Sequence, residues 1–470
     1  MEDNMSLEIK NICCIGAGYV GGPTMAVIAN KCPSIKVTVV DINERKIANW
    51  NSNDLTKLPV FEPGLDLIIE NCRNKNLFFS TNLQDAIANA DMIFISVNTP
   101  TKTRGVGAGK ASDLKWVEES ARKVVKYAKG KTIVVEKSTI PVRTAEAIKL
   151  ILDTSNKSDE YKQEFSVLSN PEFLSEGNAI RDLEKPDRVL IGGDDKKSVK
   201  SLVDIYKRWV SPERILCTNI WSSELSKLAA NAFLAQKISS INAISGLCEK
   251  SGANIKEVAK AIGMDSRIGS QFLNAGPGFG GSCFKKDILN LIYLSEFYKL
   301  PEVAEYWEKV LEINNWQQNR IIEKIVSTLF GTLSGKKITI LGFSFKANTN
   351  DTRESPSIKI CKDLLREGAN LSIYDPKVDS EQIERELNSK NLENLSKEIN
   401  GSWEFNRSIY DAVEDSLGIV VLTEWDEFKS INWNKVSKLS NDPIWLFDTR
   451  NICNVNEASR NNIMVWSIGL

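Results

Sequence analysis

Histidine is absent from this chain of 470 residues. Without imidazole, the protein has no histidine general base, no cysteine–histidine catalytic pair and no histidine-bound metal. Proton transfer in an active site would therefore depend on Lys, Asp and Glu side chains, and we expect no metal site.

Paired cysteines and long apolar runs are also absent. The nine cysteines contain no Cys-x-x-Cys spacing, so neither a disulfide framework nor a zinc site is indicated, and a reducing compartment is favoured. No apolar run approaches the roughly 18 residues of a membrane-spanning helix. Residues 1–10 are polar and lack the character of a targeting leader. We expect a cytoplasmic protein that has no membrane partner.

Charge of one sign does not dominate either. The chain has 60 basic and 61 acidic residues and no long run of one sign, which gives no electrostatic reason to expect a nucleic-acid partner. A small-molecule ligand is the default expectation. The length predicts two or three domains, because it exceeds what one ordinary core contains.

The first 41 residues have the pattern of a dinucleotide-binding unit. An apolar run at 10–15 enters a turn with Gly16, Gly18 and Gly21; a helical stretch and a second apolar run then end at Asp41. The first glycine permits a tight turn, the second lets a pyrophosphate approach the backbone, and the third lets the helix pack on the strand. Asp41 can accept hydrogen bonds from ribose hydroxyls and would repel a 2′-phosphate. We therefore expect NAD rather than NADP.

Further strands are expected at 91–97, 131–135 and 165–169, with helices between them, for example at 113–128. This alternation predicts a parallel, doubly wound α/β sheet. Ligands of such sheets bind at the carboxyl ends of the strands. The loops at 98–100, 136–139 and 170–172 are therefore the first candidates for site lining.

A long helix is predicted from Ser222 to Glu249, because the stretch contains no proline and its apolar residues recur at helical spacing. Few charges lie between Lys227 and Lys237, so we expect both faces to be covered. A buried core helix and a subunit interface fit the pattern equally well. Lys227 and Asn231 lie four residues apart on one face. Lys227 could stabilise a developing alkoxide or take a proton, or it could form a salt bridge with Glu224.

The last third repeats the strand–helix–strand pattern at 337–342, 357–368 and 371–375, without the glycine triplet. Later strands are expected at 418–423 and 444–448, and residues 381–402 look like a polar, exposed excursion. The fold class is therefore α/β, with two Rossmann-like doubly wound domains joined by a long central helix and a helical domain. We expect an NAD-binding domain at 1–218, a helical domain at 219–332 and a Rossmann-like domain at 333–470 whose ligand is a nucleotide other than the main NAD.

Cys283 is the strongest candidate nucleophile. The run from Gly276 to Asp287 places four glycines before the thiol and predicts that Cys283 lies at or just before a helix N-terminus, where the helix dipole favours a thiolate. Asp287, one turn further on, could hold or deprotonate a water. The alternative is a buried structural cysteine. Glu172 is placed for acid–base work at a strand end, although it could equally cap the next helix.

Several long motifs resemble one family. They occupy residues 12–24, 96–103, 169–174, 221–233 and 278–283. Through them the chain, from about Ile9 to Asn451, closely resembles the NAD-dependent UDP-sugar 6-dehydrogenases, and in particular the UDP-glucose 6-dehydrogenases of the animal type. The resemblance implies oxidation of UDP-glucose to UDP-glucuronate by two NAD⁺ and one water, through a thiohemiacetal and a thioester on the cysteine.

The resemblance also implies a set of site residues. The catalytic set is Cys283, Lys227, Asn231, Asp287, Glu172 and Thr139. The NAD set is Gly16, Ala17, Gly18, Tyr19, Val20, Gly21, Asp41, Val97, Asn98, Thr99, Pro100, Thr101, Ser138, Glu176, Lys286 and Arg353. The sugar-nucleotide set is Phe173, Leu174, Arg267, Asn274, Gly278, Phe279, Gly280, Phe345, Lys346 and Arg450. A homo-oligomer, dimer or hexamer, is implied, in which Arg267 reaches a neighbouring site.

Some positions depart from the animal pattern, and two rival functions stay open. Asn274 stands where animal members carry lysine, while Gly276-Pro277 and Thr449 look more like bacterial relatives. The nearest rival is a dehydrogenase of UDP-N-acetylmannosamine or GDP-mannose. The other is a non-catalytic nucleotide sensor on the same fold, which loss of the nucleophile or of Lys227 would mark; both are present.

Overall fold

The computed structural model describes residues 6–154, 163–388 and 401–470. The chain forms two compact units, one comprising Met1–Ala230 and Leu289–Lys299 and the other Asn231–Ile288 and Leu300–Leu470. The three-domain division expected from the sequence stays a prediction.

The first unit is built on an eight-stranded sheet in the order β3-β2-β1-β4-β5-β6-β7-β8. Its strands are β1 (Asn11–Ile15), β2 (Lys36–Val40), β3 (Leu77–Ser80), β4 (Met92–Ile95), β5 (Lys131–Glu136), β6 (Glu164–Ser169), β7 (Val189–Gly192) and β8 (Ile215–Thr218). The predicted parallel sheet is confirmed for β1 to β6. β7 pairs antiparallel with β6 through Ser169 and Gly192, and β8 pairs parallel with β7, so these two strands run in the opposite direction. The strand order reverses between β1 and β4, and ligands of doubly wound sheets bind at that point.

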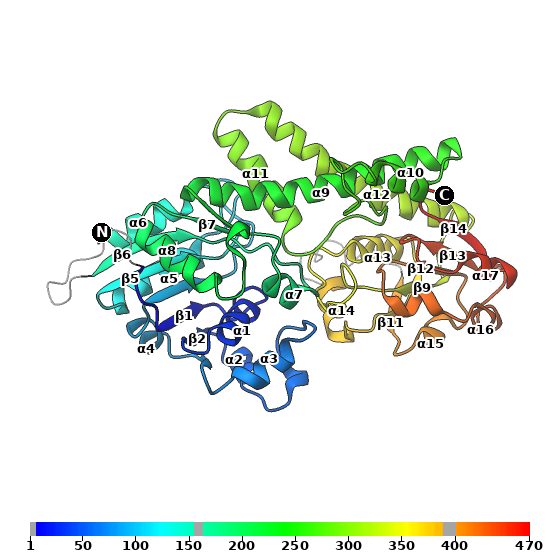
Figure 1. Ribbon diagram of the computed structural model, residues 1–470. Coiled ribbons are helices and arrows are strands. Elements are labelled where there is room, and N and C mark those ends of the chain that lie inside the picture. The colour runs from blue at the N-terminus through cyan, green and yellow to red at the C-terminus, as the bar shows by residue number, and fades with distance from the viewer. Residues whose placement is uncertain (1–5, 155–162, 389–400) are drawn as a thin grey trace. The chain divides into compact units, whose positions relative to one another are not determined.

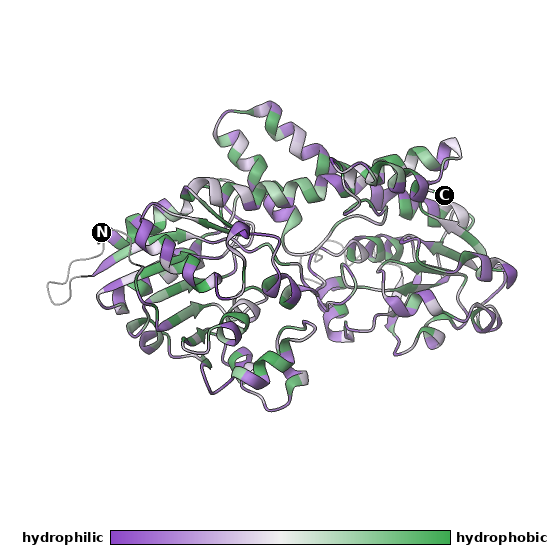
Figure 2. Cartoon of the chain, viewed as in Figure 1, coloured by the Kyte–Doolittle hydropathy of each residue, from purple (hydrophilic) through white to green (hydrophobic). Residues whose placement is uncertain are grey.

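Helices bury both faces of this sheet. They are α1 (Gly21–Lys31), α2 (Glu44–Trp50), α3 (Leu65–Cys72), α4 (Leu83–Ala88), α5 (Lys115–Tyr127), α6 (Thr144–Thr154), α7 (Ala179–Glu184) and α8 (Lys196–Tyr206). Side chains of a strand point alternately to opposite faces, so Ile12 and Cys14 of β1 enter one core cluster while Cys13 and Ile15 enter another. Figure 2 shows the strands as mostly hydrophobic. Burial on both faces explains why they read as continuous apolar runs.

The second unit contains a six-stranded, fully parallel sheet in the order β11-β10-β9-β12-β13-β14. The strands are β9 (Lys337–Leu341), β10 (Asn370–Tyr374), β11 (Ser402–Phe405), β12 (Gly418–Val421), β13 (Trp445–Asp448) and β14 (Met464–Ser467). Counted from its own first strand, the order equals that of the first six strands of the other sheet. The second Rossmann-like sheet predicted from the sequence is therefore confirmed (Figure 1).

Helices α13 (Pro356–Arg366), α14 (Ser380–Leu387), α15 (Ile409–Val413), α16 (Trp433–Leu439) and α17 (Val455–Arg460) accompany this sheet. The prediction of an exposed excursion at 381–402 is wrong for its first part. Asp379 and Gln382 form a capping box that starts α14, and Ile383 and Leu387 are buried. Residues 389–400 lie outside the described part of the chain.

The remaining long helices are α9 (Ile220–Ser251), α10 (Ile255–Gly263), α11 (Phe284–Phe297) and α12 (Pro301–Thr328). The predicted long helix is confirmed as α9, which has 32 residues and contributes to both units (Figure 1). Leu225, Phe233 and Leu247 of α9 are exposed. These positions do not support a purely buried core helix, and the expectation that both faces are covered, by the domains or by another subunit, stays a prediction.

Candidate active site

The glycine turn of the first unit joins β1 to α1. Gly16 has a φ of 109°, and a Cβ at this position would lie 2.1 Å from the carbonyl oxygen of Ser96, so only glycine fits. A Cβ on Gly18, by contrast, would meet nothing within 4 Å. The open side of this turn and the N-terminus of α1 together form a cradle that fits a pyrophosphate. Tyr19 packs against the core beside it.

Asp41, at the end of β2, is held by three donors. Its Oδ2 accepts hydrogen bonds from the Ala17 amide at 3.0 Å and from Lys46 Nζ at 2.9 Å, and its Oδ1 accepts from the Asn43 amide. Burial alone would raise the pKa of Asp41, but the bonds from Lys46, Asn43 and Ala17 outweigh it and lower that pKa. Asp41 is therefore an anion beside the glycine turn. The sequence analysis did not identify Lys46 as a partner of Asp41.

The loops that follow β4 and β5 are hydrogen-bonded to one another. Thr99 Oγ1 donates to the Thr139 carbonyl at 2.9 Å, and Ser138 Oγ donates to the Val97 carbonyl at 2.9 Å. The predicted NAD residues of these loops therefore lie close together at the carboxyl ends of neighbouring strands. The rest of the first loop varies in exposure, with Asn98 and Pro100 exposed and Thr101 half-buried.

Glu172 follows β6 and is held by a buried lysine. Its Oε2 forms an ion pair of 2.8 Å with Lys137 Nζ, and its Oε1 accepts from the amides of Phe173 and Leu174. Lys137 Nζ also donates to Asn170 Oδ1 at 3.0 Å and to Tyr206 Oη at 3.2 Å. The alternative that Glu172 caps the next helix is wrong, because its carboxylate binds its own turn and α7 begins only at Ala179.

Two cations lie near the Phe173 ring in the first unit. The Arg188 guanidinium is 3.9 Å from the centre of the Phe173 ring, and Lys227 Nζ is 5.2 Å from it. Lys227 is buried, so the aromatic face stabilises a charge that has little access to water. Two predicted site residues, Phe173 and Lys227, are thereby brought together.

Glu224, one turn before Lys227 on α9, supports the start of α6. Its two carboxyl oxygens accept from the amides of Arg143 and Ala145 at 2.7 and 2.8 Å. Burial raises the pKa of Glu224 to about 7 despite these two bonds. Burial also raises the pKa of Glu136, and the charge of Glu224 adds to that rise.

Cys283, in the second unit, precedes the first residue of α11, as predicted. Its Sγ lies 3.4 Å from Ser282 Oγ, and the Asp287 amide donates to its carbonyl oxygen at 2.9 Å. All nine cysteines of the chain are free thiols. Most of the others are buried, and burial raises the pKa of Cys13 to about 12, whereas Cys283 is half-buried. A half-buried thiol of this kind can be reached by a ligand, as a nucleophilic cysteine must be.

Asn231 and Asp287 are in direct contact within the second unit. Asn231 Nδ2 donates to Asp287 Oδ2 at 2.6 Å, and both side chains are buried. Lys286 Nζ lies 3.8 Å from the other carboxyl oxygen of Asp287. The structure therefore joins two predicted catalytic residues, Asn231 and Asp287, through the helices α9 and α11.

The loop from Asn274 to Gly280 is held by buried amide side chains. Asn314 Oδ1 accepts from the Phe279 amide at 2.8 Å, and Gln317 Nε2 donates to the Gly276 carbonyl at 2.8 Å. A Cβ on Gly278, whose φ is 120°, would lie 2.5 Å from Asn314 Oδ1. The predicted loop is thus a buried, hydrogen-bonded segment, except that Asn274 is exposed.

Predicted residues from the second sheet lie against this loop. The Phe345 ring is 3.0 Å from the position that a Cβ on Gly281 would take, and Arg450 Nη1 is 3.4 Å from the corresponding position on Gly276. Arg450 is further held by the Leu422 carbonyl at 2.8 Å and by Glu424 at 3.1 Å. Arg353 forms a bidentate pair with Asp351. Lys346 Nζ lies 5.6 Å from the ring centre of Phe345.

Arg267 stands apart from this group. Its side chain is 87% exposed and is held by Asp265 at 2.6 Å.

Leu174, in the first unit, packs against the core. Glu176 is half-buried near the start of α7, where Glu62, a residue that sequence reasoning missed, accepts from the amides of Gly177 and Ala179.

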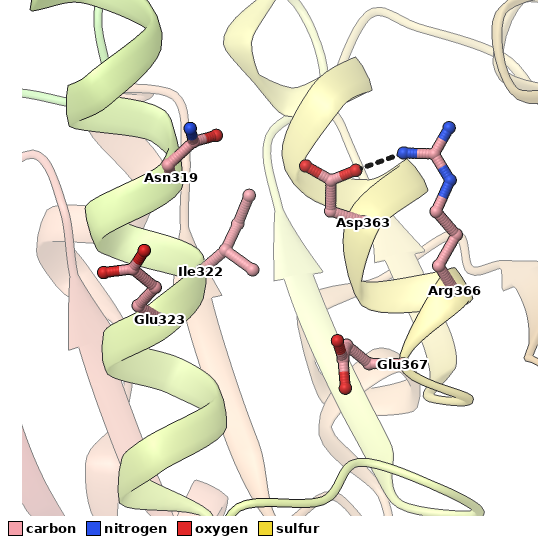
Figure 3. Close-up of a pocket in the computed structure, with 6 residues that line it drawn as sticks. All are labelled: Asn319, Ile322, Glu323, Asp363, Arg366 and Glu367. Carbon is pink, nitrogen blue, oxygen red and sulfur yellow. Dashed lines mark hydrogen bonds and ion pairs between the residues drawn. The ribbon is translucent and has the colours of Figure 1, made fainter.

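One surface cavity of about 250 Å³ lies between α12 and α13 in the second unit and is lined by Asn319, Ile322, Glu323, Asp363, Arg366 and Glu367. Figure 3 shows Asp363 paired with Arg366 across one side of it. None of these six residues belongs to the predicted sets.

Within the described residues, no three Cys, Asp or Glu side chains gather as a metal site would require, and no helix there has the length and apolarity to cross a membrane.

Sequence profiles of one family match almost the whole chain. The NAD binding domain of the UDP-glucose/GDP-mannose dehydrogenase family matches residues 10–210, its central domain residues 221–316 and its UDP binding domain residues 339–455.

Individual relatives agree with these matches. The chain is 53% identical over 474 residues to UDP-glucose 6-dehydrogenase 1 of Glycine max, covering 97% of this chain and 96% of that one. It is 55% identical over 450 residues to UDP-glucose 6-dehydrogenase of Mus musculus, covering 95% and 90%. A solved UDP-glucose dehydrogenase from the archaeon Pyrobaculum islandicum is 28% identical, covers 98% of both chains and superposes with a TM-score of 0.83. The resemblance drawn from the motifs is therefore confirmed.

Proposed function

Because the chain belongs to the UDP-glucose/GDP-mannose dehydrogenase family, we propose that it oxidises UDP-glucose to UDP-glucuronate with two NAD⁺, using Cys283 as the nucleophile. The observation that carries the proposal is the half-buried Cys283 thiol at the start of α11, one turn before the bonded pair of Asp287 and Asn231. A thiol with a carboxylate and an amide nearby suits covalent capture of an aldehyde and later hydrolysis.

NAD would be held by the first unit. The residues fit it: the open side of Gly18 admits a pyrophosphate, and Asp41 is an anion that can accept from ribose hydroxyls. Bound NAD⁺ supplies the two-electron acceptor for each oxidation. We assign the remaining contacts to Tyr19 through Gly21, to the loops Val97–Thr101 and Ser138–Thr139, and to Glu176, Lys286 and Arg353.

UDP-glucose would be held by the second unit together with Phe173 and Leu174. Beside the loop from Asn274 to Gly280, the Phe345 ring and the Arg450 guanidinium offer an aromatic face and a cation. These groups suit a uracil ring and a diphosphate. Lys346 adds a second positive charge, and we assign the sugar-nucleotide role to it as well.

The proposed reaction has two oxidations and one hydrolysis. Lys227 and Asn231 stabilise the C6 oxyanion as the alcohol loses its proton and becomes an aldehyde. The Cys283 sulfur adds to the aldehyde carbon to give a thiohemiacetal, whose oxidation gives a thioester. A water, deprotonated by Asp287 or Glu172, then attacks the thioester carbon; the C–S bond breaks, and the carboxylate and the Cys283 thiolate are released. Thr139 is assigned to the same catalytic group.

The stoichiometry of NADH tests the proposal. We expect purified protein to form two NADH per UDP-glucose consumed, measured by absorbance and by quantifying the sugar nucleotides. Cys283→Ser should make no UDP-glucuronate, because an oxygen ester on serine would not form or hydrolyse as the thioester does. One NADH per sugar would contradict the four-electron mechanism.

Substrate choice needs its own assay, because other members of the fold act on other sugars. Solved structures of UDP-N-acetylmannosamine dehydrogenases are 22% to 24% identical to this chain, a likeness that shows the fold alone. A panel of UDP-glucose, UDP-N-acetylmannosamine and GDP-mannose at equal concentration should give the largest kcat/KM for UDP-glucose. A protein that binds the nucleotides without forming NADH would be the sensor instead.

We further propose a homo-oligomer, either a dimer or a hexamer. The exposed apolar side chains of Leu225, Phe233 and Leu247 on α9 favour contact with a second copy. The Arg267 side chain, which is 87% exposed and paired with Asp265, lies on the surface, where a neighbouring subunit could meet it. Light scattering would measure the mass. The cytoplasmic location, expected because the sequence shows no disulfide pattern, targeting leader or long apolar run, stays a prediction.

A further inference from the structure

The first unit contains a polar group formed by Lys137, Asn170, Glu172 and Tyr206. Of these four residues, only Glu172 has a role in the proposed reaction. Lys137 is 3% exposed and Asn170 is 1% exposed, so this polar group is buried at the carboxyl ends of β5 and β6. Burying a lysine is costly unless its charge is paired and its hydrogen bonds are made. The arrangement therefore needs a physical reason.

All three donors of the Lys137 ammonium have acceptors. They are Glu172 Oε2 at 2.8 Å, Asn170 Oδ1 at 3.0 Å and Tyr206 Oη at 3.2 Å. Asn170 is fixed in turn, because its Nδ2 donates to the Leu190 carbonyl and its Oδ1 also accepts from Tyr206 Oη at 2.7 Å. Burial would lower the pKa of Lys137, but the Glu172 charge and the Tyr206 hydroxyl outweigh burial and raise that pKa. The lysine is thus a permanent, fixed cation.

The Glu172 carboxylate is fixed from both sides as a result. Its Oε1 accepts from the amides of Phe173 at 2.8 Å and Leu174 at 3.2 Å, and its Oε2 accepts from Lys137. A carboxylate has about four acceptor positions, so these three bonds leave about one, on Oε2, for a water. The Glu172 side chain is 14% exposed, which admits such a contact.

From this geometry we infer that Lys137 is a positioning residue, which holds Glu172 so that the remaining acceptor position of Oε2 takes the proton of the water that hydrolyses the Cys283 thioester. The inference rests on the proposed function. The proton moves from water to Glu172 Oε2 as the water oxygen bonds to the thioester carbon, and the electron pair of the broken C–S bond leaves on the sulfur of Cys283. Lys137 touches neither substrate nor cofactor in this step.

The test compares Lys137→Met with Glu172→Gln in a burst experiment with excess UDP-glucose and NAD⁺. Both variants should release about two NADH per active site quickly and then turn over slowly, because only hydrolysis is impaired. We expect kcat of Lys137→Met to fall by about 100-fold, the typical effect of misplacing a catalytic group by about 1 Å. Intact-protein mass spectrometry should find the acyl adduct on Cys283 in both variants.

Tyr206→Phe is the matched control. It removes a hydroxyl that bonds Lys137 and Asn170 rather than Glu172, so it should show kcat within about threefold of the wild type and no adduct. A merely structural role for the buried group would instead lower NAD affinity and thermal stability in Lys137→Met and Tyr206→Phe alike, without a burst and without an adduct. That result would overturn the inference.

Two further variants keep the test decisive if Lys137→Met fails to fold. Lys137→Arg keeps the positive charge but places its N–H donors in a planar guanidinium. It should fold in higher yield than Lys137→Met and should still accumulate the adduct on Cys283. Adding Lys137→Arg to Glu172→Gln should cause no further loss of kcat, since residues that act as a unit are not additive. A fully additive loss would contradict the inference. A wild-type yield of one NADH per sugar would instead overturn the proposed function, whatever the Lys137 variants do.

Discussion

Glu224 and Glu136 are buried carboxyl groups that no proposed catalytic step uses. Both are under 3% exposed, and burial is the main cause of the raised pKa of each. Glu224 nevertheless has a structural task, since it caps the first turn of α6 through the amides of Arg143 and Ala145. Its protonation therefore couples the stability of the first unit to pH.

Glu224→Gln should change this pH dependence. The pKa of Glu224 rises from 4.5 to about 7 on folding, so between these values the folded protein binds more protons than the unfolded chain. Its stabilising contribution is complete below pH 4.5 and is lost as pH rises through about 7, with a slope of up to about 1.4 kcal/mol per pH unit. The apparent Tm of Glu224→Gln minus that of the wild type should thus increase from pH 5 to pH 8.

Circular dichroism melts at several pH values would measure that difference. Glu119→Gln, at a position that is 48% exposed on α5, is a suitable control and should show a constant offset. A constant offset for Glu224→Gln as well would mean that Glu224 does not titrate in this range.

At the scale of elements, the sequence predicted those turns, strands and helices that depend on residues close together in the chain. The turn from Gly16 to Gly21, the strand that ends at Asp41 and the helix that follows Cys283 each depend on residues within a few positions of one another. The start of α14 is equally local, and the capping box of Asp379 and Gln382 could have revealed it, but the polar surroundings outweighed that signal.

The partners that hold the site residues could not be predicted in the same way. Asn314 and Gln317 bind the Gly276–Gly280 loop from α12, more than 30 positions away, and Tyr206 reaches Lys137 from α8. Only the fold brings these polar groups together. A buried Asn or Gln on an otherwise apolar helix face was the available hint, because such a group needs a bonded partner.

The turn between β1 and α1 offers a prediction at this scale, from two glycines two residues apart. Gly16→Ala would place a methyl group 2.1 Å from the Ser96 carbonyl in a left-handed backbone conformation, so we expect a loss of several kcal/mol of stability. Gly18→Ala meets no protein atom within 4 Å and should leave the apparent Tm unchanged while it weakens NAD binding by at least tenfold. Thermal melts and NAD titration by fluorescence would separate the two effects. Equal NAD affinity in Gly18→Ala and the wild type would contradict the proposed pyrophosphate cradle.

At the scale of the whole molecule, the chain consists of two units that each contain a doubly wound sheet and separate hydrophobic clusters. The strand order of the first sheet recurs in the second, and both orders reverse between the first and fourth strands. Sequence patterns predicted the central strands of both sheets but not β3, β7, β8, β11 or β14. They did not predict the antiparallel direction of β7, since pairing direction depends on how the chain returns rather than on the residues of the strand.

Each ligand should stabilise one unit by mass action. NAD⁺ at 100 times its Kd should raise the opening free energy of amides near Gly16–Gly21 and Asp41 by about 2.7 kcal/mol. UDP should do the same near Gly276–Gly280 and Phe345, with little effect on the glycine turn. Hydrogen exchange with each ligand alone would measure this. Protection of the glycine turn by UDP alone would contradict the assignment of the two ligands.

The helix α9 carries Lys227 in its part of the first unit and Asn231 in its part of the second. Four residues of α-helix separate them by about 6 Å along the axis, so the backbone sets their interval without help from side-chain packing. Substitutions along α9 can accumulate without altering that interval. A single-residue insertion between Leu228 and Ala230 would instead rotate Asn231 by about 100° relative to Lys227. The spacing of this one turn is therefore insensitive to substitutions but is broken by a single inserted residue.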